Sequence, residues 1–141
     1  MKLPTDKLRT LKARDFMAKQ VVTFLPDMPI SEAVAVLVKN KFSGAPVVDA
    51  SGRLVGMLSE KDILRVAVLE NAEGAADTRV SDCMSKNVET VEPDTDLRDV
   101  AEGFMQAPYK RFPVVEGNRL VGQISRTDVL RAIDQLLREA K

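Results

Sequence analysis

The chain has 141 residues, of which 21 are Lys or Arg and 21 are Asp or Glu, so its formal net charge is zero and no global attraction to nucleic acid or to an anionic membrane is expected. The absence of histidine excludes a histidine general base, a Ser-His-Asp triad and a histidine-ligated metal ion. The single cysteine, Cys83, excludes an intrachain disulfide and a zinc cluster.

The usual signals of membrane proteins and of enzymes are missing as well. No apolar run approaches the roughly 20 residues of a membrane-spanning helix, and residues 1–10 lack the apolar core of a signal peptide. We therefore expect a cytoplasmic protein without a membrane partner. The sequence contains neither glycine-rich phosphate loop, G-x-G-x-x-G or G-x-x-x-x-G-K-[ST], and no G-x-S-x-G elbow. With no catalytic residue and no metal ligand to assign, we do not expect an enzyme.

Residues 1–14 form a basic N-terminal arm or helix. They contain five basic side chains and a single acidic one, Asp6. We interpret this segment as a solvated leading element. The alternative, a nucleic-acid-binding tail, is disfavoured because the run is short and has no aromatic side chain for stacking on bases.

The rest of the chain repeats itself. Residues 15–30, DFMAKQVVTFLPDMPI, align with residues 82–97, DCMSKNVETVEPDTDL, and the same offset places Pro-Val-Val at 46–48 over Pro-Val-Val at 113–115. The second repeat is then one residue shorter in a turn. After this turn Arg-Leu-Val-Gly matches again, as do the Ser, Asp, Leu and Arg that follow it. We infer two copies of one structural unit. The predicted organisation is repeat 1 at 15–72, a small-residue linker at 73–81, and repeat 2 at 82–138.

Both repeats predict the same order of elements. Residues 21–23 and 88–90 are short extended pieces that end at a Pro-Asp turn. Helices follow from about residues 30 and 97, because apolar residues recur there at i, i+3, i+4, i+7 and i+8. Thr95 is the predicted N-cap of the second of these helices, and Pro108 is expected to end it soon after Ala107.

A β-hairpin and a second helix complete each repeat. The first hairpin has a three-residue loop that contains glycine, and the second turns on Gly117-Asn118. The closing helices are predicted from Ser59 to about Asn71 and from Ser125 to about Arg138. The unit is therefore β-α-β-β-α, and the fold class is α+β. Because three strands and two helices make a marginal core, we expect the two repeats to share a core with pseudo-twofold symmetry.

The repeated motif Gly-h-h-Ser-x-x-Asp, where h is mostly apolar, carries Ser59 and Asp62 in repeat 1 and Ser125 and Asp128 in repeat 2. A serine N-cap with an acid three residues later approximates a capping box, which serves stability. A strand that runs into a helix start also leaves backbone N–H groups and a positive dipole end facing a cleft. There an aspartate can accept hydrogen bonds from a sugar diol. The two interpretations are compatible, and the duplication favours the cleft.

The segment before each Pro-Val-Val is the second repeated feature. Repeat 1 has Phe-Ser-Gly-Ala at 42–45, and repeat 2 has Tyr-Lys-Arg-Phe at 109–112. Gly44 permits the close approach of a ligand to the backbone, or simply a tight turn. Lys110 and Arg111 form a compact positive site suited to phosphate oxygens, although two adjacent basic residues are more often solvated.

This unit, with P-V-V-[DE], a hairpin, L-V-G and [ST]-x-x-D, resembles the cystathionine-β-synthase (CBS) domain, and two in tandem resemble a Bateman module. The openings D-F-M…V-x-T-x-x-P-D and D-C-M…V-x-T-x-x-P-D are also similar to that family, and the resemblance covers about residues 12–138. It implies a regulatory module with no obligatory cofactor. Such a module binds an adenine nucleotide (AMP, ADP or ATP) or a related ligand such as S-adenosylmethionine or NAD, and signals to a separate, unidentified protein.

The resemblance further implies two ligand clefts between the paired repeats. One would join Ser59 and Asp62 to residues of repeat 2, namely Thr90, Lys110 and Arg111. The other would join Ser125 and Asp128 to residues of repeat 1, namely Thr23, Ser43, Gly44 and Ala45. Both aspartates would accept hydrogen bonds from ribose hydroxyls. The first cleft, with two cations, would take the more highly phosphorylated ligand.

The resemblance also implies a homodimer that buries helix faces of both subunits. Candidate contributors, which are equally suited to the core within one chain, are Val66, Leu69, Val129 and Ile133. Two alternatives stay open at this point. One is a structural homodimerisation module with empty clefts, and the other is nucleic-acid binding through residues 1–14.

Overall fold

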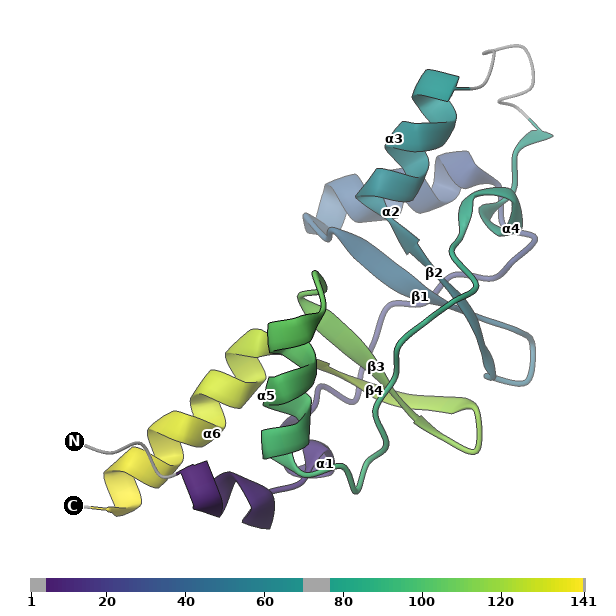
Figure 1. The fold of residues 1–141 in the computed structure, drawn as a ribbon. Coiled ribbons are helices and arrows are strands. Elements are labelled where there is room, and N and C mark those ends of the chain that lie inside the picture. The colour runs from purple at the N-terminus through teal and green to yellow at the C-terminus, as the bar shows by residue number, and fades with distance from the viewer. Residues whose placement is uncertain (1–4, 70–76, 141) are drawn as a thin grey trace. The chain divides into compact units, whose positions relative to one another are not determined.

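The computed structural model describes residues 5–69 and 77–140 (Figure 1). The chain divides into two compact units, which we call the terminal unit (Met1–Val21 with Glu89–Lys141) and the central unit (Val22–Val88). The terminal unit thus combines the opening of the first repeat with most of the second, and the central unit does the converse. Residues 70–76 lie outside the described residues. They include the predicted end of the first closing helix and the first part of the predicted linker.

Within its described residues, the central unit consists of a β-hairpin and three helices. Its elements are α2 (Ile30–Asn40), β1 (Gly44–Val48), β2 (Leu54–Ser59), α3 (Glu60–Leu69) and α4 (Val80–Cys83). β1 and β2 are antiparallel. The Asp49 amide donates to the Arg53 carbonyl at 2.9 Å, which closes the predicted three-residue loop. Hydrogen bonds from the Ser51 hydroxyl and the Arg53 amide to the exposed Asp49 carboxylate lower the pKa of that group.

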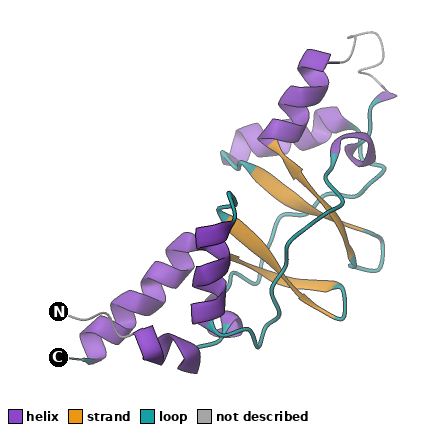
Figure 2. Cartoon of the chain, viewed as in Figure 1, coloured by secondary structure: helices purple, strands orange, loops and turns teal. Residues whose placement is uncertain are grey.

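The terminal unit has the corresponding hairpin and helices (Figure 2). Its elements are the 3₁₀ helix η1 (Thr5–Thr10), α1 (Ala13–Phe16), α5 (Leu97–Gln106), β3 (Arg111–Glu116), β4 (Arg119–Ser125) and α6 (Arg126–Glu139). The hairpin turns at Gly117 and Asn118, whose φ angles of 58° and 67° fit the type I′ turn that these residue types predict. The α+β fold class is confirmed, with one small antiparallel sheet in each unit.

The predicted strands at 21–23 and 88–90 are not formed, and each is followed by a single bridge residue. Phe24 pairs in parallel with Val47 of β1, and Val91 pairs in the same way with Val114 of β3. Each sheet therefore has two strands and not the three that the sequence predicted. The physical reason is the Pro-Asp turn that follows each extended piece, because proline has no N–H with which to continue the ladder.

The outer strand of each hairpin pairs with the opening of the other repeat. Ala18 and Gln123 of β4 exchange two backbone hydrogen bonds, of 2.8 and 2.9 Å, and Ser85 and Met57 of β2 exchange two of 2.9 Å. These two pairs occupy corresponding positions in the repeats. They explain why each compact unit is built from parts of both repeats.

The glycine of each L-V-G motif makes this exchange sterically feasible. A Cβ atom added to Gly122 would lie 2.7 Å from the Met17 sulfur and 2.8 Å from the Ala18 carbonyl oxygen. A Cβ added to Gly56 would meet Met84 and Ser85 at 2.7 and 2.9 Å. Any larger residue would push the exchanged segment off the strand.

Two separate clusters of buried residues form the core. The terminal core joins Leu8, Ala13 and Phe16 to side chains of α5, β3, β4 and α6. The central core joins Val80 and Cys83 to side chains of α2, β1 and β2. The repeats therefore contribute to two mixed cores, where one shared core was expected; the expected pseudo-twofold symmetry stays a prediction.

The helix ends follow the sequence with one correction. The N-cap of α5 is Asp96, whose carboxylate accepts from the Asp99 amide at 2.9 Å, and not the predicted Thr95. The Thr95 hydroxyl instead accepts from the Glu92 amide and stabilises the preceding turn. α5 ends at Gln106 with Ala107 as its C-cap, as Pro108 predicted.

Candidate functional site

Both Ser-x-x-Asp motifs lie where a strand runs directly into a helix. β2 ends at Ser59 and α3 follows it, and β4 ends at Ser125 and α6 follows it. In both places the serine hydroxyl accepts from the aspartate amide at 3.2 Å. The serine amide donates back to the aspartate carboxylate, at 2.9 Å in the central unit and 2.8 Å in the terminal unit. The capping-box interpretation is thus confirmed for both motifs.

The Asp62 carboxylate is enclosed by hydroxyl groups. Its Oδ2 atom accepts from the Ser59 hydroxyl at 2.9 Å, and its Oδ1 atom accepts from the Ser85 hydroxyl at 3.2 Å. Arg65 lies 3.6 Å from Oδ1, and only 5% of the Asp62 side chain is exposed. The burial of this charge is compensated by hydrogen bonds and by a cation at the protein surface.

The Asp128 carboxylate is more accessible and has a different partner. Its side chain is 17% exposed, and its Oδ1 atom accepts from Nη2 of Arg131 at 2.9 Å. Each carboxylate oxygen can accept more than one hydrogen bond, so both aspartates keep capacity for a hydroxyl group of a ligand.

The segment before each proline lies against the helix start of its own hairpin. Gly44 is opposite Ser59 in the β1–β2 register, and the Glu60 amide donates to the Ser43 carbonyl at 2.9 Å. In the other unit, Arg111 is opposite Ser125. We call residues 43–45 with 59–62 the central edge, and residues 110–112 with 125–128 the terminal edge.

The two edges differ in charge. The terminal edge carries three exposed basic side chains, of Lys110, Arg111 and Arg126, and one carboxylate. The central edge carries one basic side chain and two carboxylates, because Ser43, Gly44 and Glu60 stand at the corresponding positions. The N-terminus of α6 carries the positive end of the helix dipole, and the three basic side chains of the terminal edge add to it. This charge favours the binding of an anion there.

Arg126 was not among the predicted site residues. Its guanidinium lies 5.9 Å from the centre of the Phe104 ring, and its Nη2 atom donates to the Phe104 and Ala107 carbonyls at 3.4 and 3.5 Å. The side chain is thus anchored on the C-terminal end of α5. The change of sign from Glu60 to Arg126 between the repeats was the signal that could have revealed it.

Gly44 has a structural explanation within its own sheet. A Cβ atom at this position would lie 2.7 Å from the Leu58 carbonyl oxygen of the neighbouring strand. A side chain at this position would therefore require the neighbouring backbone to shift. Ala45 is buried at 2% exposure and contributes to the central core.

Within each unit, the structure brings together the predicted site residues of one hairpin and one helix start. Ser43, Gly44 and Ala45 gather with Ser59 and Asp62 at the central edge, and Thr23 directly precedes the bridge residue Phe24. Lys110 and Arg111 gather with Ser125 and Asp128 at the terminal edge, and the exposed Thr90 precedes the bridge residue Val91. Both predicted clefts combine residues of the two units, so these combinations stay predictions.

Metal-binding clusters and membrane-spanning helices are both absent from the described residues. In the described ranges, no three His, Cys, Asp or Glu side chains are grouped as they are around a metal ion. None of the helices in the described part of the chain has the length and apolar character needed to cross a membrane.

Comparison with known proteins gives matches to both repeats. The family profile of the CBS domain matches residues 13–69 and again 80–135. The protein MJ1426 of Methanocaldococcus jannaschii is 30% identical, over 85% of this chain and 89% of its own length.

Two solved structures have the same fold. The CBS-pair protein CBSX2 from Arabidopsis thaliana, solved in complex with AMP, is 28% identical with a TM-score of 0.81, over 91% of this chain and 99% of its own. The CBS domain pair of MJ0100, in complex with 5-methylthioadenosine and S-adenosyl-L-methionine, is 26% identical with a TM-score of 0.72, over 89% of this chain and 97% of its own.

Proposed function

The chain belongs to the CBS domain family, of which it carries two tandem copies, and we propose that it is a regulatory module that binds an adenine nucleotide or a related adenosyl ligand. The complexes of CBSX2 with AMP and of MJ0100 with two adenosyl compounds support this class of ligand. AMP, ADP and ATP are the favoured ligands, with S-adenosylmethionine and NAD as further members of the class. The module acts on a separate protein that reads its ligand-bound state.

The observation that carries this proposal is the duplicated helix start. Each one holds an aspartate carboxylate at the end of a strand, beside backbone N–H groups of a helix N-terminus. A carboxylate complements a ribose diol, and a helix N-terminus complements a phosphate. A nucleoside phosphate carries both of these groups in one molecule.

The full proposal assigns each aspartate to residues of the other unit. Ser59 and Asp62 act with Thr90, Lys110 and Arg111, and Ser125 and Asp128 act with Thr23 and residues 43–45. The charge difference between Lys110-Arg111 and Ser43-Gly44 supports different ligands at the two sites. The site with the two basic residues is expected to take the more highly phosphorylated nucleotide.

A homodimer is part of the proposal, and exposed apolar side chains on α3 support it. Leu64, Val68 and Leu69 are 62%, 79% and 74% exposed. At the positions that correspond to Val68 and Leu69, α6 carries Asp134 and Gln135. A second copy is therefore expected to cover α3 first. Of the other candidate interface residues, Val129 belongs to the terminal core, and Val66 and Ile133 pack against the cores.

One observation favours the alternative of a structural dimerisation module with empty clefts. Both aspartates already have partners within the helix cap, so their positions are explained without a ligand. The nucleic-acid alternative is disfavoured, because Arg9 is paired with Asp96 and Asp99 and Arg14 is paired with Asp94.

Thermal unfolding with added ligand distinguishes these functions. We expect AMP, ADP, ATP, S-adenosylmethionine or NAD to raise the melting temperature, while uridine monophosphate, which lacks adenine, does not. A ligand at 100 times its dissociation constant adds about 2.7 kcal/mol, or roughly 8 °C for a chain of this size. Chromatography of the nucleotide after incubation should show no turnover. No shift with any of the five ligands would support the dimerisation module instead.

A further inference from the structure

Residues 5–18, which we call the N-terminal segment, are docked on the second repeat at several points. Leu8, Ala13 and Phe16 are 6%, 0% and 8% exposed in the terminal core. The Leu97 amide donates to the Leu11 carbonyl at 3.0 Å. The segment is therefore an integral part of the terminal unit, and its residues 5–14 are not the solvated arm that their charge predicted.

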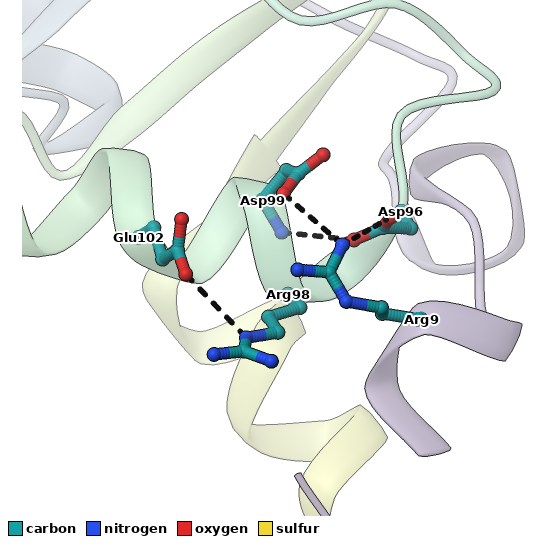
Figure 3. A network of polar contacts seen from close by, with 5 residues as sticks. All are labelled: Arg9, Asp96, Arg98, Asp99 and Glu102. Atoms are coloured by element: carbon teal, nitrogen blue, oxygen red, sulfur yellow. Dashed lines mark hydrogen bonds and ion pairs between the residues drawn. The ribbon is translucent and has the colours of Figure 1, made fainter. Parts of the chain in front are cut away.

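Exposed ion pairs hold the first part of this segment (Figure 3). Arg9 lies 3.3 Å from Asp96 and 3.5 Å from Asp99, at the start of α5. The Arg9 side chain is 50% exposed. Such surface pairs contribute little to stability and weaken as salt rises.

Arg131 of α6 adds a side-chain contact near the end of the segment, where Ala18 is already paired with Gln123. Its Nη2 atom donates to the Phe16 carbonyl at 2.9 Å, where α1 ends, and its guanidinium lies 5.7 Å from the centre of the Phe16 ring. The same Nη2 atom donates to Oδ1 of Asp128 at 2.9 Å. Arg131 is thus a direct link between the N-terminal segment and the carboxylate of the second Ser-x-x-Asp motif.

The repeats align Arg65 of the central unit with Arg131, but the two arginines differ in their surroundings. The corresponding Arg65 lies 3.6 Å from Asp62, which is beyond hydrogen-bond distance. Cys83 stands where the first repeat has Phe16, so that no aromatic ring is present for the guanidinium to cover. The Ser85 hydroxyl orients Asp62 at 3.2 Å instead, and Ala18 corresponds to Ser85 in the first repeat.

We propose that Arg131 is a positioning residue that couples ligand binding at Asp128 to docking of the N-terminal segment, so that this segment transmits the bound state to the partner protein. The proposal rests on the proposed function, because it requires a ligand hydroxyl at Asp128. The coupling adds to that function the element that responds to the ligand, the N-terminal segment. It involves the second Ser-x-x-Asp motif and not the first.

The direction of the coupling follows from the hydrogen bonds. Arg131 fixes the orientation of the Asp128 carboxylate, which lowers the entropic cost of binding a ligand hydroxyl. The oxygens of Asp128 have lone pairs for both donors, so the ligand adds to the contact with Arg131 and does not replace it. Coupling between two sites is reciprocal, so a ligand that benefits from Arg131 must stabilise the docked segment by the same factor.

Amide hydrogen exchange of the full chain with and without AMP tests this coupling. The Ala18 amide, which donates to the Gln123 carbonyl at 2.8 Å, reports on docking of the segment. We expect saturating AMP to slow its exchange about fivefold, the lower end of typical coupling factors. In Arg131→Gln, AMP should bind about fivefold more weakly and leave exchange at Ala18 unchanged.

Two further variants separate positioning from folding. Arg65→Gln is the matched control, because it alters the corresponding arginine of the other repeat, and it should leave the AMP effect on Ala18 as in the unmodified chain. Arg131→Lys retains the positive charge beside Asp128 but not the planar group over Phe16. It should restore AMP affinity and the AMP-induced protection of the Ala18 amide in the same proportion, as reciprocal coupling requires, whereas loss of folding would restore neither.

The outcomes are distinguishable. If AMP binds but does not slow exchange at Ala18, or slows it equally in Arg131→Gln, the coupling is wrong and the proposed function stands. If calorimetry shows no binding of AMP, ADP, ATP, S-adenosylmethionine or NAD to the unmodified chain, the proposed function and the coupling are both wrong.

Discussion

Ser59 and Ser125 show how one set of atoms can serve both stability and binding. Each hydroxyl caps a helix, and each amide holds the aspartate that we assign to ligand binding. The sequence predicted both caps, because Ser-x-x-Asp after a strand has few other solutions. It did not predict the different partners of the carboxylates, Ser85 and Arg131, because these depend on which segment docks beside each helix start.

The incorrect prediction for α5 has a simple physical cause. Thr95 and Asp96 are adjacent, and both are good N-cap residues, so hydrophobic periodicity does not decide between them. The turn at residues 92–95 uses the Thr95 hydroxyl as an acceptor, which leaves Asp96 to cap the helix.

Ser125→Ala is expected to destabilise the protein without unfolding it. The change removes the acceptor for the Asp128 amide and should cost about 1 kcal/mol of unfolding free energy. Urea denaturation measures this cost. Thr127→Ala, at an exposed position in the first turn of the same helix, is the control and should change stability by less than about 0.5 kcal/mol. Equal stability of the two variants would show that the cap contributes nothing.

At the scale of elements, the sequence identified the helices and hairpins but misjudged the N-terminal segment. The basic charge of residues 1–14 indicated a solvated arm, whereas the structure buries Leu8 and Ala13. Charge dominated the prediction because the helical turns here are too short for a clear apolar period. The exchange of openings between repeats was also missed, since alignment of the repeats cannot show whether a segment packs on its own copy or on the other.

Gly122→Ala tests this exchange. The added methyl group would meet the Met17 sulfur at 2.7 Å and the Ala18 carbonyl at 2.8 Å, so the segment must shift away from β4. We expect a loss of about 1–3 kcal/mol in chemical denaturation, together with faster exchange of the Ala18 amide. The matched control is Gly117→Asn in the open hairpin turn, where asparagine tolerates the positive φ and no atom lies within 4 Å. Unchanged stability of Gly122→Ala would show that the segment does not pack here.

At the scale of the whole molecule, the duplication was the most informative feature of the sequence. It predicted the family, the α+β class and the order of elements. Residues that are the same in both copies mark the positions that the shared structure needs. It left open which ligand binds, because Lys110-Arg111 and Ser43-Gly44 indicate the charge of the ligand and not its identity. The chain also passes between the compact units twice, near residues 21 and 88, so that each repeat depends on the other for part of its core.

Isothermal titration of AMP, ADP, ATP, S-adenosylmethionine and NAD, each in turn, into the full chain measures whether the duplicated aspartates bind an adenosyl ligand. The account predicts saturable heat for the unmodified protein and at least a tenfold loss of affinity in the double variant Asp62→Asn, Asp128→Asn, since each lost charged hydrogen bond costs about 1.5–3 kcal/mol. Circular dichroism should show that the double variant remains folded. Absence of heat with all five ligands, or equal affinity in the folded double variant, would rule out a ligand site at these aspartates.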